Sequence, residues 1–304
     1  MANIYVTNIP GNAVYIISGQ TNQVIGKLSV PAPGGIALSP GGQRIYVTSQ
    51  SGNNVWVFNT RTKKLICKIP VGRSPQGIAV TPSGQRVWVA NSDSNNVSVI
   101  HVSTRRVVRT LSAGQGPSRL AISPTGKTVY VSNTLSDHVS VYRALTMTRM
   151  KTIAVGKNPG HIAFTPRGIR AYVVNSGSNN VSVIKTATQT EVAKIPVGYV
   201  GSRDPYGIAV SQNGKLLFVS EFVDSLLSIA IPSNQLVRKL IFSDETTGSK
   251  APQGIAVFAN RLYMVASAND QVEIRAIPSL KVIATIDVPS TLESEQGLAE
   301  IAVG

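Results

Sequence analysis

The chain has 304 residues, of which 42% are hydrophobic and 14% charged, with a formal net charge of +15. This composition is typical of soluble globular proteins, and the single cysteine, Cys67, excludes an internal disulfide framework and a cysteine-based metal cluster. No run of about 18 apolar residues occurs, so no membrane-spanning helix is expected. The first residues do not resemble a signal peptide, which fits a cytoplasmic protein as given and equally an exported mature form that has lost its signal.

Two landmarks recur along the chain with a period in the low forties. The first is an aromatic residue near the start of a β-rich phrase, at Tyr5, Tyr46, Trp88, Tyr130, Tyr172, Phe218 and Tyr263. The second is the apolar residue of "Gly-Ile-Ala" or its variants, at Ile36, Ile78, Leu120, Ile162, Ile208, Ile255 and Leu298. Each unit accommodates four short strands, for example at 77–82, 86–91, 96–102 and 106–112, and such a unit is typical of a propeller blade. The sequence thus predicts one all-β domain over residues 1–304, a seven-bladed β-propeller of four-stranded antiparallel blades with the aromatic residues between the blades.

The phase of the repeat predicts how the ring closes. The chain opens in a second strand, "NIYVTN", and ends in a first strand, "QGLAEIAVG". One blade must therefore take its innermost strand from the C-terminal end and its other three strands from the N-terminal end. We expect residues near 298–303 to pair beside residues near 4–8, which covers strand edges that would otherwise be open.

Four short phrases carry a family resemblance. "IYVTN" at 4–8, "IYVTS" at 45–49, "VYVSN" at 129–133 and "AYVVN" at 171–175 resemble the YVTN-type β-propeller repeat. The resemblance covers the whole chain and implies a seven-bladed propeller of a kind often found in exported or surface proteins. It implies little about chemistry, because this fold hosts many functions.

Basic residues gather at one end of the predicted ring. The connections from first to second and from third to fourth strands share one face, called here the bottom face, and the other connections form the top face. Fourteen of the 29 Lys and Arg residues, Arg86 among them, lie in bottom connections, and ten of the 14 acidic residues lie in or beside top ones. The sequence predicts non-specific docking of an anionic polymer or surface by a monomeric protein, through a strip on two successive third-to-fourth connections: Arg61, Lys63, Lys64, Arg105 and Arg106. The alternative is a solvated face that keeps the protein soluble.

A second candidate site lies where the top loops converge at the axis, which is where ligand sites in ring-shaped folds usually lie. The candidate ligand-binding residues are Gln76, Arg119, His161, Arg203, Tyr206, Glu221 and Gln253. Glu221 stands where four other blades have Asn, and His161 and Glu221 are the candidate proton donor and acceptor of a catalytic site. The alternative is that Arg119 and His161 only fill a water-filled tunnel.

These features favour a binding or interaction propeller, with a basic bottom face and a ligand-sized funnel at the top of the channel. The alternative is an enzyme, a lyase or a lactone hydrolase, with its active site in the same funnel. No cofactor or metal is expected. A calcium site built from Glu221 and the repeat asparagines is the weaker reading, because Asn side chains at these positions also serve to hydrogen-bond adjoining turns.

Overall fold

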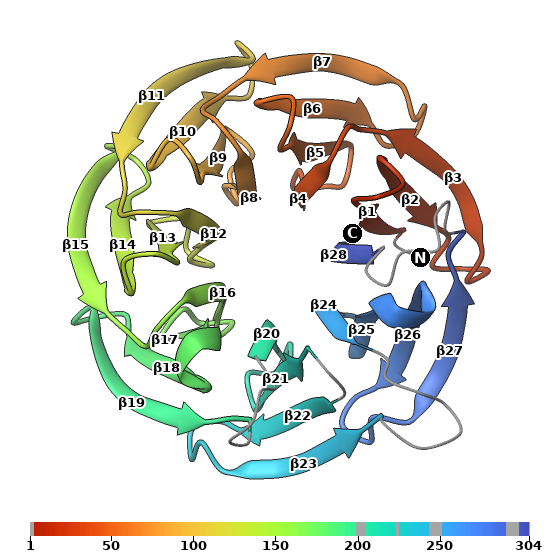
Figure 1. Cartoon of the computed structure of the whole chain (residues 1–304), viewed down its shortest axis with the longest axis vertical. Helices are drawn as coiled ribbons and strands as arrows, with labels where there is room; N and C mark the ends of the chain where they lie inside the picture. The colour runs from red at the N-terminus through yellow and green to blue at the C-terminus, as the bar shows by residue number, and fades with distance from the viewer. Residues whose placement is uncertain (1–2, 199–204, 223–224, 243–250, 290–297, 304) are drawn as a thin grey trace.

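The computed structural model describes residues 3–198, 205–222, 225–242, 251–289 and 298–303. In these residues seven four-stranded antiparallel sheets stand around a central axis, which confirms the predicted propeller (Figure 1). From the axis outward, blade A holds β28 (Leu298–Val303), β1 (Ile4–Asn8), β2 (Ala13–Ile17) and β3 (Val24–Ser29), and blade B holds β4 (Pro33–Leu38), β5 (Arg44–Ser49), β6 (Asn54–Asn59) and β7 (Leu65–Pro70). Blade C holds β8 (Pro75–Val80), β9 (Arg86–Asn91), β10 (Asn96–His101) and β11 (Arg106–Ser112). Blade D holds β12 (Pro117–Ile122), β13 (Thr128–Asn133), β14 (His138–Arg143) and β15 (Thr148–Ala154).

Blades E to G follow the same order. Blade E holds β16 (Pro159–Phe164), β17 (Arg170–Asn175), β18 (Asn180–Lys185) and β19 (Thr190–Pro196). Blade F holds β20 (Pro205–Val210), β21 (Leu216–Glu221), β22 (Ser225–Ala230) and β23 (Leu236–Ile241). Blade G holds β24 (Pro252–Phe258), β25 (Arg261–Ala266), β26 (Gln271–Ala276) and β27 (Val282–Asp287). Two single-turn 3₁₀ helices, η1 (Ser176–Ser178) and η2 (Ser267–Asn269), lie in top connections. Neither these helices nor any other among the described residues has the length and apolar character needed to cross a bilayer.

The ring closes as the repeat phase predicts. Strand β28 pairs antiparallel with β1, with Val303 opposite Ile4 and Leu298 opposite Asn8. The pairing is irregular between Val6 and Asn8, where the register shifts. A strand from the C-terminal end thus becomes the innermost strand of a blade whose other strands come from the N-terminal end (Figure 1).

The first predicted strand of blade C, 77–82, is displaced from the observed β8, which spans Pro75–Val80. Strand β8 starts earlier because Pro75 already pairs with Asn91. It ends earlier because Thr81 begins the turn: its hydroxyl accepts the Arg86 N–H at 3.1 Å, and the following Pro82 has no N–H to donate. The second and fourth strands were predicted correctly, and the third ends one residue sooner, at His101.

The recurrent aromatic residues lie in the core between blades, as predicted. All seven are between 0 and 5% exposed. Tyr46 of blade B packs in one cluster with Ile78 and Val89 of blade C, and Tyr172 of blade E packs with Val219 of blade F. Each aromatic side chain therefore removes apolar surface of two blades from water, which stabilises the ring by about 25 cal/mol for each Å² buried.

Candidate functional site

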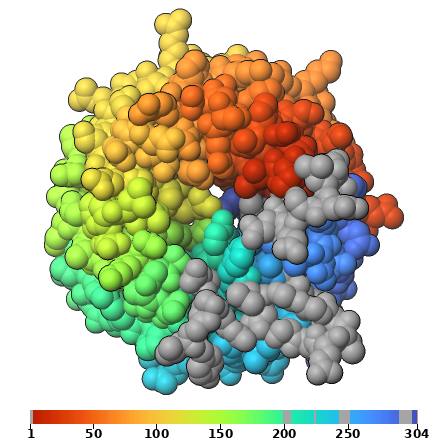
Figure 2. Space-filling model, in the orientation of Figure 1, coloured from red at the N-terminus to blue at the C-terminus, as the bar shows by residue number. Residues whose placement is uncertain are grey.

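The top of the channel holds a cluster of four side chains from four blades. Arg119 lies on β12, His161 on β16, Tyr206 on β20 and Glu300 on β28, and these innermost strands all border the axis (Figure 1). Strand pairing is irregular at Arg119, His161 and Tyr206, where the register shifts between Pro117 and Arg119, Pro159 and Ile162, and Pro205 and Ile208. Such bulges redirect side chains, here toward the channel. In a space-filling view a narrow opening remains at the centre of the ring (Figure 2).

Most blades have glycine at the place occupied by Arg119, His161 and Glu300. By strand register this place holds Gly35, Gly77, Gly207 and Gly254 in the other blades. A Cβ on Gly35 would lie 2.5 Å from the Gln76 carbonyl oxygen, and one on Gly207 would lie 2.4 Å from the Gln253 carbonyl oxygen. Neighbouring innermost strands are thus too close for a side chain in these blades. Three blades depart from this packing rule, and their three charged or titratable side chains meet one another.

Arg119 is the hub of the cluster. Its Nη2 donates to Glu300 Oε1 at 2.8 Å and to the Tyr206 hydroxyl at 3.0 Å. Its Nε lies 3.0 Å from His161 Nε2, and its Nη1 donates to the Ser118 carbonyl at 3.3 Å. The side chains of Arg119 and Glu300 are 18% and 15% exposed, so the ion pair is shielded from water but not sealed from it.

His161 is held so that one nitrogen is left with two competing partners. Its Nδ1 lies 2.9 Å from the Tyr206 carbonyl oxygen, which can only accept, so Nδ1 carries a hydrogen. Its Nε2 faces the Arg119 Nε–H donor at 3.0 Å and the two Glu300 carboxylate oxygens at 3.1 and 3.2 Å. A neutral ring accepts from Arg119, whereas a protonated ring donates to Glu300. Both nitrogens of the ring are therefore held by hydrogen-bond partners within the cluster.

The charges of the cluster shift the pKa values of its members. Burial alone would raise the pKa of the Glu300 carboxyl, but His161 and Arg119 outweigh burial and lower that pKa from 4.5 to about 2. Burial alone would lower the pKa of Arg119, but Glu300 and the Tyr206 hydroxyl raise it above its usual value. Burial raises the pKa of Tyr206. Near neutral pH the cluster therefore holds an anionic Glu300, a cationic Arg119 and a protonated Tyr206 that can donate.

A pocket of about 180 Å³ lies beside this cluster on the top side. Arg119, His161 and Tyr206 form one wall, and Ser118 and Asn158 are among the other residues that line it. The pocket is smaller than most sites for drug-sized ligands, which measure about 300–1,000 Å³. It offers a guanidinium, an imidazole and a phenol to a small polar molecule.

Glu221, the predicted partner of His161, is not part of this cluster. Its carboxylate is fully buried inside blade F, where it accepts from the Gly198 N–H at 2.6 Å, from Lys239 Nζ at 3.0 Å and from the Ser225 hydroxyl. The corresponding Asn91 makes similar local bonds, from its Nδ2 to Asn96 Oδ1 at 2.8 Å and to the Ser98 hydroxyl at 2.9 Å. The structure therefore does not bring His161 and Glu221 together as donor and acceptor.

The structure places the remaining predicted site residues apart from one another. Gln253 is buried on β24 and donates to the Ser267 hydroxyl at 3.0 Å, while Gln76 is half-buried on β8. Arg203 lies outside the described residues. The repeat asparagines bond turns and strands within their own blades, and within the described residues no three His, Cys, Asp or Glu side chains gather as metal ligands would.

The sequence did not predict Glu300 as a site residue, because the apolar landmark of the closing strand was assigned to the wrong residue. The sequence pattern put the apolar landmark of the closing strand at Leu298, but Ile301 pairs with Val6 and Ala302 pairs with Tyr5. In blade C the corresponding pairs are Ile78 with Val89 and Ala79 with Trp88. The phrase "EIA" at 300–302 therefore matches "RLA" at 119–121 and "HIA" at 161–163, and this alignment was the available signal.

The five residues of the predicted basic strip, Arg61, Lys63, Lys64, Arg105 and Arg106, are all exposed. Blades B and C meet along this strip: the charge of Arg105 lies near enough to Cys67 of blade B to oppose the rise in its pKa that burial causes. Lys63 differs from the others because its Nζ donates to the Ile25 carbonyl of blade A at 2.5 Å. The strip therefore spans two adjacent blades, and one of its five charges is already bonded.

Comparisons with known proteins agree with the architecture. Residues 13–110 match the family described as a lactonase, a 7-bladed beta-propeller, and residues 120–226 match the family described as a YNCE-like beta-propeller. No curated protein matches the sequence. Hydrazine synthase of Kuenenia stuttgartiensis is 22% identical, with a TM-score of 0.78 over 90% of this chain and 90% of that chain.

Two further structures are similar over nearly their whole length. A functionally unknown protein from Desulfotomaculum acetoxidans is 17% identical, with a TM-score of 0.80 over 100% of this chain and 99% of that chain. The periplasmic gluconolactonase PpgL of Pseudomonas aeruginosa is 18% identical, with a TM-score of 0.75 over 99% of this chain and 98% of that chain. At these identities the likeness shows the fold alone. The repeat, the closure and the two family matches agree: the chain is a seven-bladed β-propeller with repeats of the YVTN type, and one part of it is similar to the lactonase family and another part to the YNCE-like family.

Proposed function

We propose that the protein is a binding propeller that takes a small polar organic molecule, a hydroxy acid or its lactone, at the top of its channel. The observation that carries this proposal is the departure from glycine in three blades. Packing requires no side chain at that place, yet Arg119, His161 and Glu300 occupy it and form one hydrogen-bonded cluster beside a pocket. Polar residues that converge in a concave site, without a need for packing, are typical of ligand sites.

The cluster suits a ligand with hydroxyl and carboxyl or ester oxygens. Arg119 and Tyr206 supply donors at the wall of the pocket, and Glu300, which does not line the pocket, holds Arg119 in place from behind the wall. A guanidinium binds carboxylate oxygens through charge-assisted hydrogen bonds, which are stronger than neutral ones. Because Glu300 already satisfies one face of Arg119, an uncharged lactone or a hydroxyl group fits the site without displacing a charge.

A direct binding measurement tests this proposal. We expect titration calorimetry to detect binding of D-gluconate or D-glucono-δ-lactone, and Arg119→Gln to weaken it about tenfold or more, the effect of losing one charge-assisted bond. Lys64→Gln, which also removes one positive charge but from the exposed bottom strip, is the matched control and should leave affinity unchanged. Equal affinities of all three proteins, or no binding of either compound, would contradict the proposal.

Lactone hydrolysis is the second candidate, and the match of residues 13–110 to a lactonase family favours it. In such a reaction His161 Nε2 would take a proton from water, the water oxygen would bond to the carbonyl carbon, and Arg119 and Tyr206 would stabilise the resulting oxyanion. The ring C–O bond would then break, with the proton returned from His161 to the leaving oxygen. We expect acid release from gluconolactone above the uncatalysed rate, lost in His161→Gln but kept in Lys64→Gln. A rate equal to the uncatalysed one would exclude this candidate.

We further propose that the basic strip docks anionic polymers through charge alone. Arg61, Lys64, Arg105 and Arg106 are exposed on adjacent blades. Affinity for heparin should fall steeply with salt, as for any binding that releases condensed counterions. Changing all five strip residues to Glu should abolish binding, whereas Arg119→Gln should not affect it. Tight binding that survives high salt and the charge reversal would contradict this role.

A further inference from the structure

The pocket beside the cluster is also lined by two hydroxyl side chains of blade D. Ser118 lies on β12, directly before Arg119, and Thr134 lies in the connection that follows β13. Both are half-buried, and both line the pocket of about 180 Å³ together with Arg119 and Tyr206. A molecule that fills this small pocket therefore contacts the two hydroxyl side chains as well as the charged cluster.

The hydrogen bonds of these hydroxyl groups show which of them still has a hydrogen to donate. The Thr134 hydroxyl donates to the Pro159 carbonyl oxygen at 2.9 Å, because a carbonyl oxygen can only accept. The Ser118 hydroxyl lies 2.6 Å from the Thr134 hydroxyl. Since Thr134 has already given its one hydrogen to Pro159, Ser118 is the donor in this pair. The Ser118 oxygen has thus given away its only hydrogen and can offer a ligand only its acceptor lone pairs.

The neighbouring Ser132 leaves this assignment unchanged. Its hydroxyl lies 3.3 Å from the Ser118 hydroxyl, but it donates to the Arg119 carbonyl at 3.2 Å and accepts from the Arg119 backbone N–H at 3.2 Å. Ser132 is fully buried and does not line the pocket. The hydrogens of all three hydroxyl groups are therefore used within the protein, and Ser118 and Thr134 face a ligand as acceptors.

The side of the pocket formed by Arg119 and Tyr206 has the opposite character. The Tyr206 hydroxyl accepts from Arg119 Nη2 at 3.0 Å, and its own hydrogen has no acceptor among the described residues. Arg119 has five N–H groups, and four of them have partners: His161, Glu300, Tyr206 and the Ser118 carbonyl. The fifth, on Nη1, is left over. This side of the pocket therefore keeps two hydrogens to donate, one on the phenol and one on the guanidinium.

We infer that Ser118 is a specificity-determining residue of the top pocket and that it recognises a hydroxyl group next to the carboxyl or lactone carbonyl group of the ligand. The ligand carbonyl oxygen accepts from Tyr206 and Arg119, and the neighbouring hydroxyl donates to Ser118 Oγ. Arg119 Nη1 lies 3.3 Å from the Ser118 carbonyl, so donor and acceptor belong to one corner of the pocket and match groups on adjacent carbons. The inference rests on the proposed function and narrows its ligands to 2-hydroxy acids and their lactones.

D-gluconate and 2-deoxy-D-gluconate test the inference by titration calorimetry, because they differ only in the hydroxyl group next to the carboxylate. We expect the wild-type protein to bind D-gluconate about tenfold or more tightly, since the deoxy compound leaves the Ser118 acceptor unpaired. Ser118→Ala should abolish this difference. Tyr206→Phe should weaken both compounds and keep the difference, because both carry the carboxylate. Ser103→Ala removes an exposed hydroxyl of the bottom face and, as the control, should change neither affinity.

Ser118→Ala also removes a hydrogen bond to Thr134, so its melting temperature is measured first. A loosened pocket would weaken both compounds alike, whereas lost recognition weakens D-gluconate alone. Ser118→Thr retains the hydroxyl and should retain the difference. Equal affinities of the wild type for the two compounds, or a difference that survives Ser118→Ala, would overturn the inference and leave the proposed function standing. Failure of D-gluconate to bind would also overturn it, and D-glucono-δ-lactone, titrated in parallel, would then decide whether the proposed function fails as well.

Discussion

The two ends of the channel use charge in opposite ways. At the top, Arg119 and Glu300 are mostly buried and bonded to each other, to His161 and to Tyr206. At the bottom, Arg61 and Lys64 are exposed and their charged groups have no partner among the described residues. Buried pairs act locally and demand defined geometry, whereas exposed charges act through a field that salt screens. The top charges should therefore govern stability and the bottom charges association.

Removal of the closing strand should have the largest effect on the top end. A chain that lacks residues 295–304 loses β28 and with it the innermost strand of blade A and the carboxylate of the cluster. It also exposes the edge of β1 to other chains. We expect aggregation or loss of a cooperative thermal transition, measured by circular dichroism. A truncated protein that melts at the full-length temperature would show that the ring does not depend on this closure.

A single substitution in the cluster should have the next largest effect. Glu300→Gln keeps the shape of the side chain but leaves the charge of Arg119 without compensation in a mostly buried site. We expect the free energy of unfolding, from urea denaturation, to fall by about 3 kcal/mol, the lower end of the range for breaking a buried pair. Asp287→Asn removes an exposed carboxylate of β27 and should cost less than about 0.5 kcal/mol. Equal effects of the two changes would contradict the comparison between paired and exposed charges.

Acid should weaken the same ion pair without any mutation. The folded-state pKa of Glu300, about 2, lies below its ordinary value of 4.5. The unfolded chain therefore takes up a proton at Glu300 at higher pH than the folded chain does, and the stabilisation is present above pH 4.5 and lost as pH falls toward 2. The difference in stability between the wild type and Glu300→Gln should shrink across this window. Curves that stay parallel from pH 5 to pH 2 would show that Glu300 titrates normally.

The sequence predicted the fold because each blade repeats the same local rules. The buried aromatic and the apolar landmark recur in every blade and the turn glycine in blades B to F, so an error at one position is corrected at the others. The closing strand is where this redundancy ends: a shift of three residues, from Ile301 to Leu298, hid Glu300. Arg119, His161 and Tyr206 were predicted together because they lie in blades whose landmark was placed correctly.

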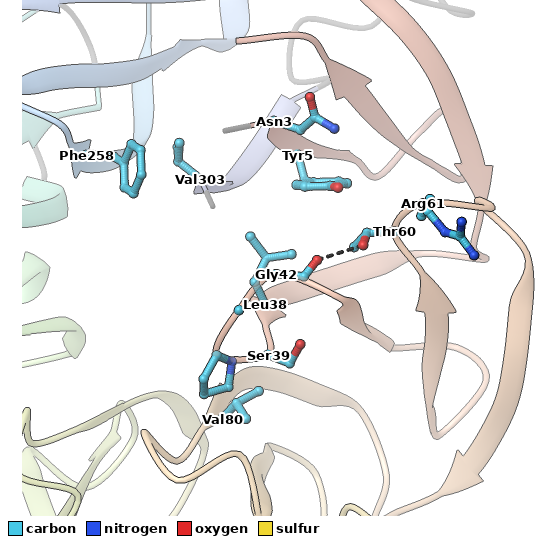
Figure 3. Close-up of a pocket in the computed structure, with 12 residues that line it drawn as sticks. Asn3, Tyr5, Leu38, Ser39, Gly42, Thr60, Arg61, Val80, Phe258 and Val303 are labelled. Atoms are coloured by element: carbon cyan, nitrogen blue, oxygen red, sulfur yellow. Dashed lines mark hydrogen bonds between the residues drawn. The ribbon is translucent and has the colours of Figure 1, made fainter. Parts of the chain in front are cut away.

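Two other features depended on geometry that no single position in the sequence reveals. Glu221 ends a strand, and whether such a side chain points to the channel or into its own sheet depends on the local pairing. In blade C the third strand carries Ser98 two residues beyond Asn96, the pairing partner of Asn91, and this serine was a sign that the Asn91 side chain points into the sheet. A pocket on the bottom side, lined by residues of β1, β4 and β28 among others (Figure 3), could not be predicted either, because it depends on how strands from distant parts of the chain pack together.

The smallest expected effect separates two basic residues of the bottom face that the sequence treats alike. Arg86 Nη1 donates to the carbonyls of Ala144 and Leu145 at 2.8 and 3.0 Å and so ties blade C to blade D, whereas Lys64 is exposed and unbonded. We expect Arg86→Gln to lower the free energy of unfolding by about 1 kcal/mol, because bonds from a charged donor are lost. Lys64→Gln should change it by less than about 0.5 kcal/mol. Both changes remove one positive charge, so both should weaken heparin binding, and only the stability measurement should tell them apart. If Lys64→Gln destabilised the protein as much as Arg86→Gln, the bottom charges would be structural, and the contrast between the two ends of the channel would fail.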